Sequence, residues 1–106
     1  MTRAVTLIET HLLDERDFLA VDTLCRLCGL DLPAMVELAE LGVVAPRGYA
    51  PADWQLPATS LPTLRRVGRL MRDLGVNVSG AALVVELLET QRRLERRLQE
   101  LEQHLP

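Results

Sequence analysis

The stretch that decides the fold covers residues 21–44 and reads VDTLCRLCGLDLPAMVELAELGVV. Asp22 is placed to cap a first short helix that extends to Cys28, and Gly29 is placed to end it. Asp31 is placed to cap a second helix, in which apolar residues recur at helical spacing up to a second glycine. Two short helices joined by a tight turn predict a helix–turn–helix.

The charge of this unit is unusual for a helix–turn–helix. Arg26 is its single basic residue, and it faces acids at Asp22, Asp31, Glu37 and Glu40. A protein that binds duplex DNA has to neutralise several phosphates with Lys or Arg side chains. The unit therefore predicts a protein partner with a basic surface, and these four acids are the candidate contacts. The two aspartates are also compatible with helix caps, and the two glutamates with solvated charges.

The composition fits one small, mostly helical domain. The chain has 106 residues, of which 3% are aromatic, so Leu, Val and Ala have to form the core. Residues 1–45 carry three Arg and eight acids, whereas the rest of the chain carries nine Arg and seven acids. No apolar run is long enough for a membrane span, and the first residues lack the apolar stretch of a secretory signal. We therefore expect a cytoplasmic protein.

Prolines interrupt the chain between residues 43 and 62. Val43–Val44 and residues 54–56 are expected to pair there as a minimal wing hairpin. Residues 5–20 mix short apolar runs with acids, which is compatible with short strands or with a frayed lead-in. A third helix is expected from Pro62 to Leu74, and its buried face is expected to hold Leu61, Leu64, Val67, Met71 and Leu74.

A long last helix carries a heptad pattern. It is expected to begin near Asn77 or Ser79, either of which can cap it. A small head cannot cover an apolar seam of this length, so the seam predicts a homodimer held by a coiled coil. Gln91 is polar at an a position, which is typical of residues that fix register or orientation. The seam consists of Val84, Gln91, Leu98 and Leu105 at a, and of Leu87, Leu94 and Leu101 at d.

These elements divide the chain into three parts. Residues 1–20 form an N-terminal lead, residues 21–75 form the head, and residues 76–106 form the coiled-coil dimerisation helix. The predicted fold class is all-α, with a winged helix–turn–helix head, a minimal β wing and a long C-terminal helix.

The sequence holds no set of residues typical of an enzyme. Cys25 and Cys28 form a C-x-x-C pair, but they end a helix, whereas a redox pair needs the start of one. A zinc site needs further ligands, and only His11 and His104 are present, near opposite ends of the chain. We therefore expect core cysteines, no metal, no cofactor and no catalysis. Trp54 fits either a wing residue that covers a thin core or an anchor for a partner.

The order of cap, helix, glycine turn, wing and third helix resembles the head of the MerR regulators. The spacing from Gly29 to residues 41–44 is similar to the corresponding segment of that family. The chain is also similar to a narrower family, the chaperone-modulator proteins CbpM. This second resemblance rests on Leu24-Cys25, on LGVVAP at residues 41–46, on WQL at residues 54–56, and on the Arg-rich third and Leu/Arg/Glu-rich last helices.

The narrower resemblance implies a function. CbpM proteins bind the J-domain of the co-chaperone CbpA, and they block its cooperation with the Hsp70 chaperone DnaK as well as its DNA binding. We therefore expect a chaperone modulator that binds the J-domain of a CbpA/DnaJ-type co-chaperone and inhibits its activity. J-domains present a basic helix to Hsp70, and an acidic surface can compete for such a helix.

The alternative is a MerR-type DNA-binding transcriptional regulator. It is supported by four arginines on the third helix, Arg65, Arg66, Arg69 and Arg72. MerR regulators, however, carry arginines and tyrosines along the second helix, where this chain has Pro33, Val36, Glu37 and Leu38. Nucleic acid is therefore not the expected partner.

Overall fold

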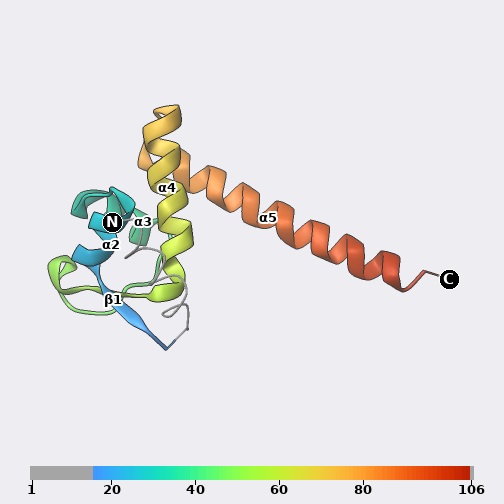
Figure 1. Cartoon of the computed structure of the whole chain (residues 1–106), viewed down its shortest axis with the longest axis horizontal. Coiled ribbons are helices and arrows are strands. Elements are labelled where there is room, and N and C mark those ends of the chain that lie inside the picture. The colour runs from blue at the N-terminus through green and yellow to red at the C-terminus, as the bar shows by residue number, and fades with distance from the viewer. Residues whose placement is uncertain (1–15, 106) are drawn as a thin grey trace.

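A helical head with one projecting helix makes up the computed structural model, which describes residues 16–105. The head surrounds a common core, and the later part of the last helix runs outward from it to the C-terminal end (Figure 1). This arrangement confirms the predicted mostly helical fold with a small sheet and a long last helix. The elements are β1 (Phe18–Ala20), α2 (Val21–Cys28), α3 (Leu32–Glu40), η1 (Pro51–Asp53), β2 (Gln55–Pro57), η2 (Ala58–Ser60), α4 (Leu61–Leu74) and α5 (Val78–Gln103).

Helix α2 follows strand β1 without a break. Ala20 is its N-cap residue, and the backbone amide of Val21 donates to the carbonyl of Trp54 at 2.9 Å. The prediction that Asp22 caps this helix is therefore wrong. Asp22 lies in the first turn, where an acid still stabilises the helix dipole, and its carboxylate pairs with the Arg26 guanidinium at 3.4 Å.

Helix α3 has both of its predicted ends. The Oδ1 atom of Asp31 accepts a hydrogen bond from the Ala34 amide at 2.9 Å, which confirms the cap. After the helix, Gly42 adopts a φ of +79°, and the amide of Val43 donates back to the carbonyl of Leu38 at 2.9 Å. This reversal closes the helix and turns the chain towards the loop that follows.

The small sheet joins segments other than those predicted. Strand β1 runs antiparallel to β2, with Leu19 opposite Leu56, so the predicted pairing of Val43–Val44 with residues 54–56 is wrong. The amide of Val43 is already used to close α3, and the side chain of Val44 is buried in the core. The wing strand therefore comes from the N-terminal lead, of which residues 1–15 lie outside the described part of the chain.

Helix α4 crosses α2 at very close range. Gly68 lies so near the carbonyl oxygen of Cys28 that a Cβ atom at this position would overlap it. One turn later, the guanidinium of Arg72 donates to the same carbonyl, with 3.2 Å between Nη1 and the oxygen. A cation at the C-terminal end of a helix interacts favourably with the helix dipole. The two contacts together fix how α4 sits on the helix–turn–helix.

The predicted buried face of α4 is confirmed except at its end. Leu61, Leu64 and Val67 are fully buried and Met71 packs against the core, whereas Leu74 is 67% exposed. The last turn of α4 extends beyond α2 and α3 (Figure 1), so these helices do not cover Leu74.

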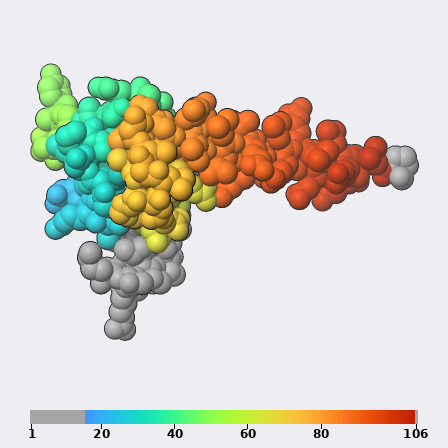
Figure 2. Space-filling model, turned by 90° about the horizontal axis from the view of Figure 1, so that it is seen from above, coloured from blue at the N-terminus to red at the C-terminus, as the bar shows by residue number. Residues whose placement is uncertain are grey.

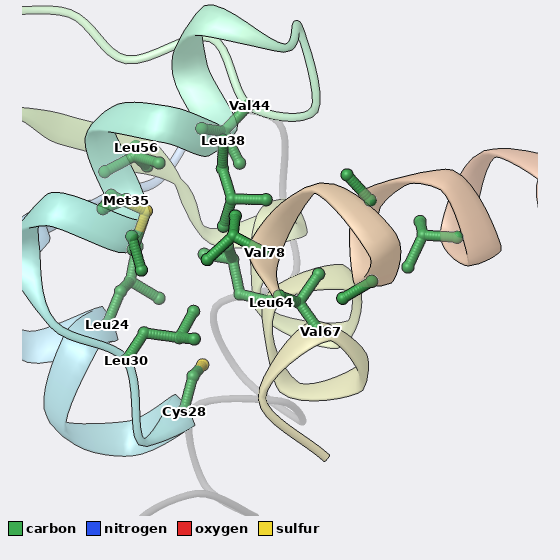
Figure 3. Packing of buried hydrophobic residues seen from close by; sticks show 14 of the residues in the cluster. Leu24, Cys28, Leu30, Met35, Leu38, Val44, Leu56, Leu64, Val67 and Val78 are labelled. Atoms are coloured by element: carbon green, nitrogen blue, oxygen red, sulfur yellow. The ribbon is translucent and has the colours of Figure 1, made fainter. Parts of the chain in front are cut away.

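One apolar cluster holds the head together. Figure 3 shows Leu24 of α2, Met35 and Leu38 of α3 and Leu64 of α4 facing a common centre. Burying a side chain of this size contributes roughly 1.5–3 kcal/mol to stability. The first turns of α5 complete the cluster with Val78, Ala81, Ala82 and Val85.

No helix among residues 16–105 is both long enough and apolar enough to cross a bilayer.

Replacing Gly68 by alanine is expected to destabilise the head. The added methyl group would overlap the Cys28 carbonyl oxygen, so α2 and α4 have to separate, at about 1–3 kcal/mol of unfolding free energy. Chemical denaturation followed by circular dichroism, at one fixed protein concentration, measures this loss. Arg69→Ala at the exposed neighbouring position is the matched control and should change the value by less than about 0.5 kcal/mol. Equal stability of the two variants would refute the close contact.

The cap of α3 gives a second stability prediction. Asp31→Ala removes the acceptor of the Ala34 amide and should lower the unfolding free energy by about 1 kcal/mol. Asp22→Ala removes an exposed ion pair and a first-turn acid, which both contribute little at the surface, so its cost should stay below that of Asp31→Ala. The same denaturation experiment ranks the two variants, and an equal loss in both would contradict the assignment of a single aspartate cap.

Candidate functional site

The four predicted partner contacts do not form one cluster. Asp22 and Asp31 line a hollow of about 460 Å³ between α2 and the start of α3. Glu37 and Glu40 lie towards the C-terminal end of α3, where Glu37 is bonded to Ser79 of α5. The structure therefore divides the acids of the helix–turn–helix into one pair between α2 and the start of α3 and a second pair towards the end of α3.

The first pair already has partners within the chain. One carboxylate oxygen of Asp31 caps α3, and Asp22 is paired with Arg26. The hollow between them is otherwise formed largely by apolar side chains, among them Val21 and Leu30. Both acids thus have a structural role besides any role in binding.

Glu37 of the second pair is bonded to a residue that lines a groove between the end of α3 and α5. The hydroxyl of Ser79 donates to Oε1 of Glu37 at 2.9 Å and so joins the two helices. We call this hollow of about 500 Å³ the α3–α5 groove. The apolar and acidic side chains that line it include Leu41, Val43, Leu83, Glu86 and Glu89.

Sequence reasoning missed the part of this groove that α5 contributes. Leu83 directly precedes the heptad position Val84, so the coiled-coil pattern drew attention away from it. Glu86 and Glu89 were not singled out either, because the last helix carries many other charged residues. The available signal was Leu83 itself, because an apolar residue outside the a and d positions has no place in the seam.

The outward face of α3 lacks the groups that a DNA reader needs. Pro33 and Glu40 are exposed, Val36 and Glu37 are half-buried, and no residue of α3 is basic. The positive charge of α4 is partly used inside the fold, since Arg72 donates to the carbonyl of Cys28. This distribution presents carboxylates where a helix–turn–helix normally meets phosphates.

The cysteine pair belongs to the core, as predicted. Burial, with a smaller contribution from the nearby Cys25, raises the pKa of the Cys28 thiol to about 12, against the opposing effect of the Arg72 guanidinium. Burial also raises the pKa of the Cys25 thiol, with smaller contributions from the carboxylates of Asp22 and Asp31. Both thiols therefore stay protonated at neutral pH, which disfavours nucleophilic chemistry. Within residues 16–105, no group of three His, Cys, Asp or Glu side chains is placed to hold a metal ion.

Trp54 packs against the core from its half-buried position before β2. Its carbonyl accepts the hydrogen bond from the amide of Val21, so the backbone at this residue also anchors the start of α2. These contacts agree with the interpretation of Trp54 as a wing residue over a thin core.

The predicted seam lies on the solvent-exposed side of α5. Figure 2 shows α5 leaving the head as a single projecting helix. Gln91 does not disturb the helix, because its side-chain amide donates to Oε1 of Glu95 at 3.3 Å. The leucines of the seam are 57–70% exposed, namely Leu87, Leu94, Leu98, Leu101 and Leu105.

Comparison with known proteins places this arrangement in a family. The family model described as MerR HTH family regulatory protein matches residues 19–103. The chaperone modulatory protein CbpM of Pseudomonas entomophila is 32% identical over 83 residues, which cover 78% of this chain and 82% of the relative. The CbpM protein of Coxiella burnetii (strain Dugway 5J108-111) is 28% identical over 102 residues, which cover 96% and 94% of the two chains. No solved structure gives a significant match.

The matches extend over the head and the last helix together. The family model starts within β1 and reaches the end of α5. The relatives agree with this chain in length as well, because the alignments cover most of both proteins. The chain therefore belongs to the MerR-type helix–turn–helix proteins and, among them, to the CbpM family of non-enzymatic chaperone modulators.

Proposed function

We propose that this protein binds the J-domain of a CbpA/DnaJ-type co-chaperone in the cytoplasm and inhibits its activity. The observation that carries the proposal is a helix–turn–helix whose second helix has acids and no basic residue, in a chain that belongs to the CbpM family. Such a helix is suited to a basic protein surface and unsuited to phosphates.

The proposed mechanism is competition for one surface. The basic helix that a J-domain offers to Hsp70 would be covered by the acidic face of this protein, so the chaperone could not engage it. Attraction between opposite charges speeds the encounter and favours the correct partner more than it adds affinity. The proposed contacts are Asp22, Asp31, Glu37 and Glu40.

The alternative function, transcriptional regulation through DNA binding, has less support. Binding through the helix–turn–helix would place Glu37 and Glu40 against the duplex, and like charges repel. The arginines of α4 do not repair this, because they lie on another helix and Arg72 is engaged with Cys28. The family's own name, chaperone modulatory, also points to a protein partner.

We further propose that the protein acts as a homodimer. An isolated helix with a row of leucines in water exposes an apolar stripe that a second copy can cover. The exposed side chains of Leu94 and Leu98 lie in the middle of this stripe. A dimer would present two acidic heads, so one modulator would have two binding sites for its co-chaperone.

Binding to a J-domain is tested by titration. The purified protein is expected to bind an isolated CbpA-type J-domain with a dissociation constant in the micromolar range or below, and to suppress J-domain stimulation of the Hsp70 ATPase. Glu37→Lys/Glu40→Lys should weaken binding by about tenfold or more, because it reverses two charges of the proposed contact surface. Isothermal titration calorimetry and an ATPase assay measure the two effects.

The control reverses two exposed acids elsewhere. Asp73→Lys/Glu100→Lys changes the net charge equally and should bind like the unaltered protein. Absence of binding by the unaltered protein at micromolar concentration would overturn the proposed function. Equal affinity of both double variants would overturn only the assignment of Glu37 and Glu40.

The dimer is tested separately. Leu94→Glu/Leu98→Glu places charges in the seam and should convert the protein to a monomer, as measured by light scattering after gel filtration. Arg96→Glu/Gln99→Glu lies on the same helix outside the a and d positions and should leave the dimer intact. A monomeric unaltered protein, or a dimer that survives the seam variant, would contradict the predicted coiled coil.

A further inference from the structure

The α3–α5 groove combines two properties that one partner can satisfy together. Leu41, Val43 and Leu83 are among its lining residues, and two of them stand open to water, Leu41 at 50% and Leu83 at 56% exposed. Large apolar side chains gathered in a concave site are typical of surfaces that bind another protein. The groove also lies between the end of α3 and α5, and a groove on a protein surface can receive the apolar face of an amphipathic helix.

Carboxylates lie beside these leucines. Glu86 and Glu89 of α5 line the groove, and Glu37 of α3 is bonded to the groove residue Ser79. Glu40, Glu86 and Glu89 are exposed, and none of them forms an ion pair with residues 16–105. Glu37 uses one oxygen to accept from Ser79.

Positive charge at the groove is sparse. Arg93 is the only basic residue of its lining, and its guanidinium donates to the hydroxyl of Thr90 at 3.0 Å. Glu86 and Glu89 in the lining, together with Glu37 bonded to Ser79, outnumber this arginine, so the local charge is opposite in sign to that of a lysine- or arginine-rich segment.

From this geometry we infer that the α3–α5 groove is the docking site for a basic amphipathic helix of the co-chaperone. The inference rests on the proposed function, and it selects one of the two acidic surfaces as the contact. Apolar side chains on one face of the partner helix would cover Leu41 and Leu83, while its lysines and arginines would meet the glutamates on both sides. The hollow beside Asp22 and Asp31 is a weaker site, because those acids already serve the cap of α3 and the pair with Arg26.

A second copy of this chain fits the groove less well. The chain as a whole is acidic, with a formal charge of −3, whereas the proposed partner helix is basic. The groove also lies beside Ala82 and Val85, which face the head, whereas the exposed leucines Leu94 and Leu98 belong to the projecting part of α5. Self-association and partner binding can therefore use different faces of one helix.

The test separates the apolar and the charged contributions. Leu41→Ala/Leu83→Ala and Glu86→Lys/Glu89→Lys are each titrated, as full chains, against the CbpA-type J-domain. Each double variant should weaken binding by about tenfold or more, because each removes a contact at the centre or the edge of the site. The charge variant should also lose most of the salt dependence of the association rate. Circular dichroism confirms folding, and light scattering follows the oligomeric state.

Matched controls exclude general effects. Leu74→Ala removes a leucine at the end of α4 that is 67% exposed, and Asp73→Lys/Glu100→Lys makes the same charge change outside the groove. Both controls should bind like the unaltered protein.

The outcomes are distinct. Binding that persists in both groove variants would overturn the groove as the docking site and leave the proposed function standing. Conversion of the groove variants to monomers would show that a second copy occupies the groove and would also overturn the inference. Failure of the unaltered protein to bind any CbpA-type J-domain would overturn the proposed function, and this inference with it.

Discussion

The contact between Gly68 and the carbonyl of Cys28 is the constraint on which the head depends. Interiors of proteins are packed as densely as organic crystals, so a single methyl group at a helix crossing changes the position of both helices. Here the crossing places α4 against the end of α2, and Arg72 completes the contact through the same oxygen. Once α4 is fixed, the chain has only a short turn before α5 begins, so this crossing also sets the direction in which α5 leaves the head.

The separation of buried and exposed positions in the head explains how a fold associated with DNA can bind another kind of partner. Buried positions of the two short helices, such as Leu24 and Leu38, keep the helix–turn–helix intact. Solvent-facing positions are free to change, because surface charges contribute little to stability. On that face Glu37 and Glu40 set the sign of the charge that a partner meets, and neither side chain is part of the buried core. Family membership and the charge pattern therefore lead to the same class of partner by separate routes.

Local signals in the sequence predicted the elements well and their long-range pairing less well. The cap at Asp31 and the reversal at Gly42 depend on a few neighbouring residues, and both were found. The partner of β2 was missed because strand pairing depends on distant segments, and Leu19 had no pattern that tied it to Leu56. The candidate site was half predicted for the same reason. Glu37 was named, but the groove depends on α5, whose Ser79 bonds to Glu37 and whose Leu83 lines the hollow.

Helix α5 has different stabilities along its length. Its first turns are part of the core, whereas its later turns are exposed, so local unfolding is easier at the C-terminal end than near Val85. The groove uses the region between these two parts, at Glu86 and Glu89. Any interaction that orders the exposed end of α5 also lowers the conformational entropy that α5 would lose when a ligand binds in the groove. Because such coupling is reciprocal, occupation of the groove would strengthen self-association by the same factor by which self-association strengthens binding at the groove.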